Sequence, residues 1–455
     1  MFLRNLAIAA ATACTLASCG SNTTTNAVTV TNDTATIDGH PAWALQGNIY
    51  EVNIRQYTPE GTFNAFAKQL PRLKEMGVQT LWFMPINPIS KVDRKGVLGS
   101  YYAVADYTAI NPEFGNLDDW KQLVQKAHDL GFKVIIDWVP NHTGADHRWL
   151  TTNPDFYEKD STGKPKFAFD WSDTRSLNYD NPVLVDSMIA AMKYWITESN
   201  IDGFRCDVAG EVPTAFWKKC IAELKQVKNV FMLAEADKGE LHEAGFDASY
   251  PWDMFATTKE IANGKKDATY VDSIRLKYNT NHPTNYMKMY FTSNHDENSW
   301  NKADYATMPG AVHAPFAVLT QTLSNSMPLI YSGQEEPFLD SISFFYKDTI
   351  LFNKFERASF YQTLLQLRSS NPALAANASF AKEKIGNEKA IYAFTRSAGG
   401  KRILVITNLS NQPQTVSITN TALHGKATDV FTKAAVSIDA NTITLNPWDY
   451  KVYAY

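Results

Sequence analysis

Residues 117–142, LDDWKQLVQKAHDLGFKVIIDWVPNH, form the unit that decides the fold. Residues 117–130 carry apolar side chains at helical spacing, and Gly131 follows them as a helix stop. The short apolar run at residues 134–139 is typical of a buried strand, and polar residues follow it. A helix that leads directly into such a strand predicts an α/β fold.

The same alternation of helix and strand recurs along most of the chain. Eight apolar runs are predicted as strands, at residues 45–51, 80–85, 134–139, 203–208, 230–235, 246–250, 287–293 and 329–332. Helical patterns follow many of them, for example at residues 63–76 and 183–199. Eight strands with crossover helices over roughly 300 residues predict a closed (β/α)8 TIM barrel.

Three further segments complete the predicted domain organisation. The barrel is predicted over residues 44–372, and the polar, aromatic stretch at residues 141–181 predicts a small subdomain inserted after strand three. Beyond residue 372 the segments become short, β-rich and bounded by turns. This change predicts a C-terminal all-β sandwich domain over residues 373–455.

The N-terminal residues have the pattern of an export signal. The apolar stretch is too short for a transmembrane helix, so residues 1–18 are predicted to be a signal peptide. LASC at residues 16–19 resembles a bacterial lipobox, in which Cys19 is lipidated; the alternative is an ordinary signal with a chance cysteine. Residues 19–43 are predicted to be a flexible tether. We expect a protein secreted across the inner membrane and lipid-anchored, on the periplasmic or surface face.

Composition excludes several classes of protein. The chain has 455 residues, 44% of them hydrophobic, which indicates a globular protein with a sizeable core. The net charge of −4 argues against a nucleic-acid partner. Cys206 and Cys220 lie in a predicted strand and the following helix, so we expect no disulfide between them. The aromatic content of 13% is a surplus that can serve a core, an interface or a sugar platform.

Polar side chains gather at the predicted strand ends, where a barrel forms its active site. They are His142, Arg205, Asp207, Glu235, His295 and Asp296. Each alone is commonly a cap or a solvated loop residue, but their convergence on four strand ends favours catalysis. Two carboxylates flanking a glycosidic bond can act as nucleophile and acid/base. Arg205 lies on the same strand face as Asp207 and would keep it ionised.

These segments resemble the four signature regions of glycoside hydrolase family 13, the α-amylase family, in the family's order. Three more segments resemble motifs of the family: SYYAVADY at residues 100–107, SLNY at 176–179 and MPLIYSGQE at 327–335. The resemblance covers about residues 44–370, and the β-rich tail that follows fits the family's C-terminal domain.

The resemblance implies a role for each matching residue. Asp207 would be the nucleophile, Glu235 the general acid/base, and Asp296 the residue that stabilises the distorted sugar. Four residues would hold the glucose on the scissile side: Tyr102, His142, Arg205 and His295. Trp138, Trp252 and Trp300 also fall near strand ends and are candidates to line a sugar cleft.

Two departures concern metal and sugar binding. Many family members have Lys-His three and four residues after the nucleophile, where this chain has Gly210 and Glu211. Asn141 matches a calcium ligand of the family, and Asp170 or Asp173 could assist it. A structural calcium ion therefore stays an open expectation, while the chemistry itself implies no cofactor.

The expected function is a retaining hydrolase of α-1,4-glucosidic bonds in starch or malto-oligosaccharides. An α-glucosidase, cyclomaltodextrinase or transglycosylase of the same family is the alternative, and a non-catalytic glycan-binding lipoprotein is the alternative from another class. The expected partners are an α-glucan and, through the N-terminal lipid, a membrane. The oligomeric state is left open.

Overall fold

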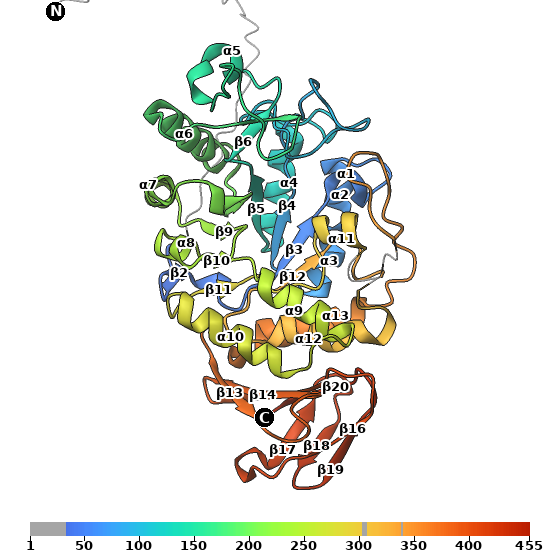
Figure 1. Ribbon diagram of the computed structural model, residues 1–455. Helices are drawn as coiled ribbons and strands as arrows, with labels where there is room; N and C mark the ends of the chain where they lie inside the picture. Colours follow the sequence, from blue (N-terminus) through green and yellow to red (C-terminus); the bar gives the residue numbers. More distant parts are fainter. Residues whose placement is uncertain (1–32, 303–306, 338–339) are drawn as a thin grey trace, which may run out of the picture.

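The computed structural model describes residues 33–302, 307–337 and 340–455, so the predicted signal peptide and Cys19 lie outside the described residues. Eight strands form one sheet in the order β11-β10-β9-β8-β5-β4-β3-β12, and every neighbouring pair is parallel (Figure 1). They are β3 (Ile49–Val52), β4 (Thr80–Phe83), β5 (Lys133–Trp138), β8 (Gly203–Cys206), β9 (Phe231–Ala234), β10 (Ala248–Ser249), β11 (Met287–Lys288) and β12 (Leu329–Tyr331). All eight coincide with predicted strands.

The sheet closes between β11 and β12. Lys288 forms a parallel bridge with Ser326, and the Leu329 N–H donates to the Tyr290 carbonyl at 2.9 Å. The (β/α)8 barrel is therefore confirmed. β10 and β11 are only two residues long. The apolar residues that follow β11, such as Met289, are buried in the same apolar cluster as the barrel strands but do not extend the strand. Apolar runs alone do not distinguish the two arrangements.

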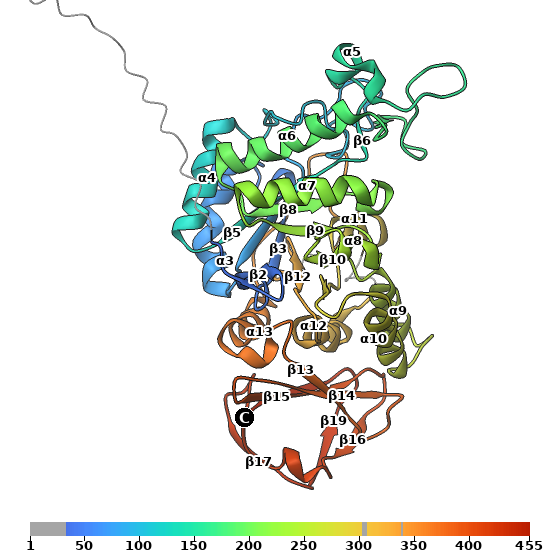
Figure 2. The same ribbon diagram turned by 90° about the vertical axis from the view of Figure 1, so that its left-hand side faces the viewer.

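Helices surround the barrel in the view of Figure 2. They include α4 (Leu117–Asp129), α6 (Pro182–Ser199), α7 (Thr214–Val227), α9 (Trp252–Ala262), α10 (Thr269–Asn281), α12 (His313–Thr322) and α13 (Ala358–Ser370). Asn116 and Asp119 form a capping box that starts α4. The helix predicted at residues 63–76 is divided into α2 (Phe63–Phe66), a 3-10 turn and α3 (Leu70–Met76), and Pro71 stands in the first turn of α3, where a missing N–H costs nothing.

The insertion leaves the barrel after β5 and returns at α6. It contains the antiparallel pair β6 (His142–Gly144) and β7 (Thr174–Ser176) and the short helix α5 (Trp149–Thr152). Figure 1 places α5 at the opposite end of the molecule from the C-terminal strands. The insertion therefore stands on the face of the barrel to which the strands point.

The C-terminal residues form two packed antiparallel sheets. One has the order β13-β14-β15-β20-β17-β18 and the other pairs β16 with β19. The strands are β13 (Ser379–Glu383), β14 (Ile391–Ala398), β15 (Lys401–Asn408), β16 (Gln414–Ser417), β17 (Gly425–Asp429), β18 (Ala435–Ile438), β19 (Thr442–Leu445) and β20 (Tyr450–Ala454). Leu404 and Ile406 of the first sheet share an apolar cluster with Val416 and Leu445 of the second, which confirms the all-β domain.

Three smaller features bear on the sequence predictions. Residues 36–41, within the predicted tether, form the hairpin β1 (Thr36–Ile37) and β2 (His40–Pro41). Cys206 and Cys220 are buried free thiols. In the part of the chain that the structure describes, no helix is both long and apolar enough to cross a membrane.

Candidate active site

The predicted site residues meet in a cavity of about 530 Å³ at the carboxyl ends of the strands. Asp207 follows β8, Glu235 follows β9, and Asp296 lies in α11 (His295–Asn301), which follows β11. The residues predicted for the site that line this cavity are Tyr102, His142, Asp207, Glu235, His295 and Asp296. Parallel strands end on one face of a barrel, which is why residues so distant in sequence converge here.

Arg205 lies fully buried beneath the cavity and binds three carboxyl groups. Its Nη1 lies 2.7 Å from Asp207 Oδ1 and 2.9 Å from Asp137 Oδ1, and its Nη2 lies 3.0 Å from Glu235 Oε1. Tyr250 accepts a further hydrogen bond from Nε at 3.1 Å. The predicted contact between Arg205 and Asp207 is present, and a single guanidinium holds the carboxyls of Asp207 and Glu235 together.

The carboxyls of Asp207 and Glu235 differ in proton affinity. Burial raises the pKa of Glu235 to about 8, and the charges of Asp207 and Asp296 add to the rise against the opposing effect of Arg205. Burial raises the pKa of Asp207 only to about 6, with Arg205 acting against the rise. At neutral pH, Asp207 is therefore ionised while Glu235 keeps its proton, the division that a nucleophile and a general acid require.

His295 is held as a cation between two carboxylates. Its Nδ1 lies 2.5 Å from Glu51 Oε1, and its Nε2 lies 3.2 Å from Asp296 Oδ2. Burial opposes protonation, but the charges of Asp296 and Glu51 outweigh it and raise the pKa of His295 to about 9. The ring therefore fixes the direction of the Asp296 carboxylate beside the cavity.

Tyr102 forms a flat wall of the cavity. Its ring is stacked on His295 at 5.4 Å between centroids and on Phe344 at 6.2 Å. The hydroxyl donates to Asp137 Oδ2 at 3.0 Å and lies 2.8 Å from His295 Nε2. The hydroxyl locks the ring in place, which suits a platform for a sugar ring.

His142 lies on another wall, at the start of the insertion. Burial lowers the pKa of His142 to about 4, so the imidazole is neutral at physiological pH. Its ring contacts the edge of Trp171 from the insertion at 5.4 Å between centroids. A neutral imidazole can donate or accept a hydrogen bond with a sugar hydroxyl without bringing a charge.

Two buried carboxylates of the site were not singled out from the sequence. Glu51 on β3 orients His295, and Asp137 on β5 binds Arg205 and Tyr102. Both are fully buried. In the sequence, each is an acid inside an apolar strand, which indicates a buried carboxylate with a cationic partner, because burying an unpaired charge is costly.

The candidate aromatic residues have different roles. Trp138 is 1% exposed and packs on Tyr107 and Phe204, so it belongs to the core. Trp252 is half-buried, packs on Tyr250 and is not among the residues that line the cavity. Trp300 is 58% exposed and lines the cavity. Of these three tryptophans, Trp300 alone has the position expected of a sugar contact.

The calcium expectation can be tested against the donor groups. The Asn141 amide lies 3.3 Å from His142 Nδ1, and Asp173 lies 3.3 Å from the Lys95 ammonium. Among residues 33–302, 307–337 and 340–455, no group of three or more His, Cys, Asp or Glu side chains is arranged to hold a metal. These groups do not fit a carboxylate-rich calcium cage.

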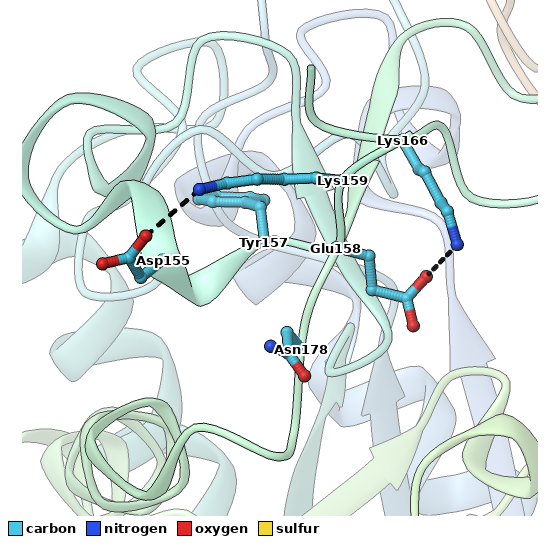
Figure 3. Close-up of a pocket in the computed structure, with 6 residues that line it drawn as sticks. All are labelled: Asp155, Tyr157, Glu158, Lys159, Lys166 and Asn178. Atoms are coloured by element: carbon cyan, nitrogen blue, oxygen red, sulfur yellow. Dashed lines mark hydrogen bonds and ion pairs between the residues drawn. The ribbon is translucent and has the colours of Figure 1, made fainter. Parts of the chain in front are cut away.

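A second cavity, of about 410 Å³, lies on the insertion (Figure 3). Figure 3 shows its two lysines turned toward acids: Lys159 lies 3.1 Å from Asp155, and Lys166 lies 3.4 Å from Glu158. These pairs are substantially exposed, and exposed pairs contribute little stability. The cavity holds none of the predicted catalytic residues.

Comparison with known proteins identifies the family. The model of the alpha-amylase catalytic domain matches residues 22–175 and 167–399. The chain belongs to the alpha-amylase family. A second model, the C-terminal domain of the alpha-amylase SusG, matches residues 391–449 of this alpha-amylase family member. The protein is thus a glycoside hydrolase.

Individual relatives agree with this assignment. An alpha-amylase of Haloarcula japonica is 26% identical over 83% of this chain, which spans 57% of that relative's length. Alpha-amylase 3 of Dictyoglomus thermophilum is 24% identical and covers 89% of this chain and 92% of its own. Among solved structures, an alpha-amylase from Lactobacillus plantarum has a TM-score of 0.81 and 30% identity, covering 90% of this chain and 99% of its own. A noncanonic maltogenic alpha-amylase from Thermotoga neapolitana has a TM-score of 0.82 and 27% identity, with 90% and 98% coverage.

Proposed function

We propose that this family member is a retaining hydrolase of α-1,4-glucosidic bonds in starch or malto-oligosaccharides. The observation that carries the proposal is that adjacent nitrogens of the Arg205 guanidinium bind Asp207 and Glu235, at 2.7 and 3.0 Å. Retaining enzymes hold their two carboxyls about 5–5.5 Å apart, whereas inverting enzymes leave about 6.5–9.5 Å for a water molecule. Two carboxyls on one guanidinium support the shorter spacing.

The proposed reaction is a double displacement. Asp207 attacks the anomeric carbon while Glu235 gives its proton to the departing glycosidic oxygen, so one C–O bond forms as the other breaks. The product of this step is a β-glycosyl ester of Asp207. Water then attacks the same carbon, Glu235 takes its proton, and Asp207 leaves as a carboxylate, which restores the α configuration.

The surrounding groups stabilise the charged transition state. Asp296, oriented by the His295 cation, places a negative charge beside the developing oxocarbenium ion. Tyr102 supplies a flat face for the reacting sugar, and His142 supplies a neutral hydrogen-bonding group. Because these side chains are already fixed by neighbours, little reorganisation is needed during the reaction.

Relatives support an α-glucan as the substrate but differ in the reaction they name. Alpha-amylases are among them, and so is an α-1,4-glucan:maltose-1-phosphate maltosyltransferase of Corynebacterium pseudotuberculosis, 27% identical over 86% of this chain and 62% of its own. That match favours glycosyl transfer as the second candidate function, since the same covalent intermediate can pass to a sugar hydroxyl instead of water.

The stereochemical outcome tests the mechanism. Proton NMR of freshly cleaved maltotetraose should show the α-anomer first, and initial release of the β-anomer would exclude retention. Product analysis on amylose, maltotriose, pullulan and cyclodextrin separates hydrolysis from transfer, because transfer gives products longer than the substrate. No turnover of any α-glucoside would instead indicate a glycan-binding protein.

We also propose that Cys19 carries lipid and anchors the enzyme to a membrane. The support is the LASC segment at residues 16–19 after an apolar stretch of signal-peptide length. Several acyl chains anchor a soluble domain stably. Radiolabelled palmitate should be incorporated into the full chain expressed in a bacterium and not into Cys19→Ser, which should appear in the soluble fraction. Equal labelling of the two would contradict the proposal.

A further inference from the structure

A buried ion pair lies beside the loop that carries Glu235 and has no part in the mechanism above. Lys288 on β11 is 0% exposed, and its Nζ lies 2.5 Å from Asp237 Oδ1. Asp237 comes two residues after Glu235 in the same turn. A buried ion pair is costly to form, and breaking one by removing a partner is commonly more costly still.

The ammonium also binds the strand on the other side of the turn. Lys288 Nζ donates to Ser249 Oγ at 2.7 Å and to the Tyr250 carbonyl at 3.4 Å, and His282 Nε2 of the α10–β11 connection lies 3.0 Å away. One cation therefore joins β10, β11 and the turn after β9. Four partners leave it little freedom to move.

Further hydrogen bonds hold the turn next to these contacts. The Tyr250 N–H donates to the carbonyls of Ala234 and Ala236, at 3.1 and 3.2 Å, which lie on either side of Glu235. On the cavity side, Glu235 Oε2 accepts from the Val208 N–H at 2.8 Å. The turn is thus held through Asp237 and Tyr250, which both contact Lys288, and the Glu235 carboxyl is held by Val208 after β8.

We propose that the Lys288–Asp237 pair is a positioning device for Glu235, which sets the carboxyl at the distance from the glycosidic oxygen that proton transfer requires. The inference rests on the role of Glu235 in the proposed function. General acids act over hydrogen-bond distances, so a small displacement of the turn slows protonation of the leaving group. Steps that need no proton transfer from Glu235 keep their rate.

The chain offers a matched control at the amino ends of β8 and β9, the strands that Asp207 and Glu235 follow. Lys228 and Asp202 precede β9 and β8, are 4% and 5% exposed, and lie 3.0 Å apart. Lys228 Nζ also binds the Asn200 carbonyl at 2.7 Å. Lys288→Met and Lys228→Met each remove one buried ammonium, so they should destabilise the fold comparably while differing in distance from Glu235.

The test measures the full chain on two substrates. Maltotetraose has a leaving group that needs a proton, and α-maltosyl fluoride has one that does not. Azide is present to accept the glycosyl group. In Lys288→Met, kcat/KM should fall about 10²-fold on maltotetraose and by less than about threefold on the fluoride. Asp237→Asn, which keeps the side-chain shape, should shift the ratio in the same direction if Lys288→Met folds poorly. Lys228→Met should leave the ratio at its wild-type value.

Glu235→Gln separates this inference from the proposed function. If it leaves the ratio between the substrates unchanged, the assignment of the acid is wrong and the inference falls with it. If Glu235→Gln changes the ratio, two results would overturn the positioning role alone. One is that Lys288→Met and Asp237→Asn lower the rates on both substrates in parallel. The other is that Lys228→Met changes the ratio as much as Lys288→Met does.

Discussion

At the scale of single residues, the chemistry depends on how one buried cation is shared. Arg205 binds Asp137, Asp207 and Glu235. Although Asp207 and Glu235 share this cation, the pKa of Asp207 is about 6 and that of Glu235 is about 8. Burial is the first cause in both cases, and the nearest guanidinium nitrogen is closer to Asp207 than to Glu235. The same environment therefore yields an ionised nucleophile and a protonated acid.

This difference predicts a bell-shaped pH profile. Below about pH 6, Asp207 takes up a proton and cannot attack, and above about pH 8, Glu235 has lost the proton that it must donate. We expect kcat/KM for maltotetraose to fall about tenfold per pH unit on each side of this window. The profile is measured with wild type and with Glu235→Gln, which should lose the alkaline limb. Activity that still rises above pH 9 would contradict the assignment.

Tyr102 allows its ring and its hydroxyl to be tested separately. Tyr102→Phe keeps the stacking face and removes the hydrogen bonds to Asp137 and His295, so kcat/KM should fall about tenfold, the value of one or two such bonds. Tyr102→Ala also removes the face and should cost about 10²-fold or more. Steady-state kinetics on maltotetraose provide the comparison. Equal losses in the two variants would mean that the ring does not contact the sugar.

At the scale of elements, the strands were predictable and their side-chain partners were not. Each barrel strand is an apolar run that ends at polar residues, and its period and length are local properties of the sequence. Glu51 and Asp137 act through partners 244 and 68 residues away in the chain, so no local pattern shows that they pair with His295 and Arg205. The sequence showed that Glu51 and Asp137 are acids inside apolar strands, but it did not show which cation each of them binds.

Ion pairs attach the insertion to the barrel in the region for which the sequence left a calcium ion open. Lys95 binds Asp173 at 3.3 Å, and Asp93 binds Arg175 at 2.9 Å, both between the loop after β4 and the insertion. The first contact engages one oxygen, Oδ1, of Asp173, which was considered as a calcium ligand. The insertion can therefore keep its place without a cation.

Chelation tests this arrangement. Because no three His, Cys, Asp or Glu side chains in the described part of the chain are grouped to hold a metal, extensive dialysis against EDTA should leave kcat/KM and the melting temperature within experimental error of the untreated enzyme. Calorimetry with and without added calcium measures the second quantity. A calcium-dependent rise in the melting temperature would contradict this expectation and show a calcium site, since a ligand that binds only the folded state stabilises it.

At the scale of the whole molecule, the C-terminal domain belongs to the same packed body as the barrel. Phe316 of α12 and Leu364 of α13 lie in one apolar cluster with Phe394 and Val452 of the sheet. Figure 2 shows the strands beneath α12 and α13, on the opposite side of the barrel from the insertion. The domain therefore covers helices that would otherwise expose an apolar surface, and its distance from the cavity favours a role in stability.

Arg396 is the polar counterpart of that apolar contact. It is 0% exposed on β14, and its guanidinium donates to the carbonyls of Thr322 and Leu323 at the end of α12, at 2.8 and 2.7 Å, and to that of Ala375 at 2.6 Å. Burial lowers the pKa of Arg396 to about 9, so the group is still charged at neutral pH. The cation satisfies carbonyls at the end of a helix, where the chain offers no further N–H.

Arg396→Met should therefore destabilise the protein without harming catalysis. Removing the charged donor leaves several buried carbonyls without a partner, and we expect the free energy of unfolding to fall by about 2–4 kcal/mol. Denaturant unfolding measures this loss, with exposed Lys401→Met on the neighbouring strand as a control that should change stability by less than about 0.5 kcal/mol. At 25 °C, kcat/KM of folded Arg396→Met should match the wild type, because the cavity lies at the other end of the barrel. A variant that keeps full stability, or one that stays folded but loses activity, would contradict the assignment of this domain to stability.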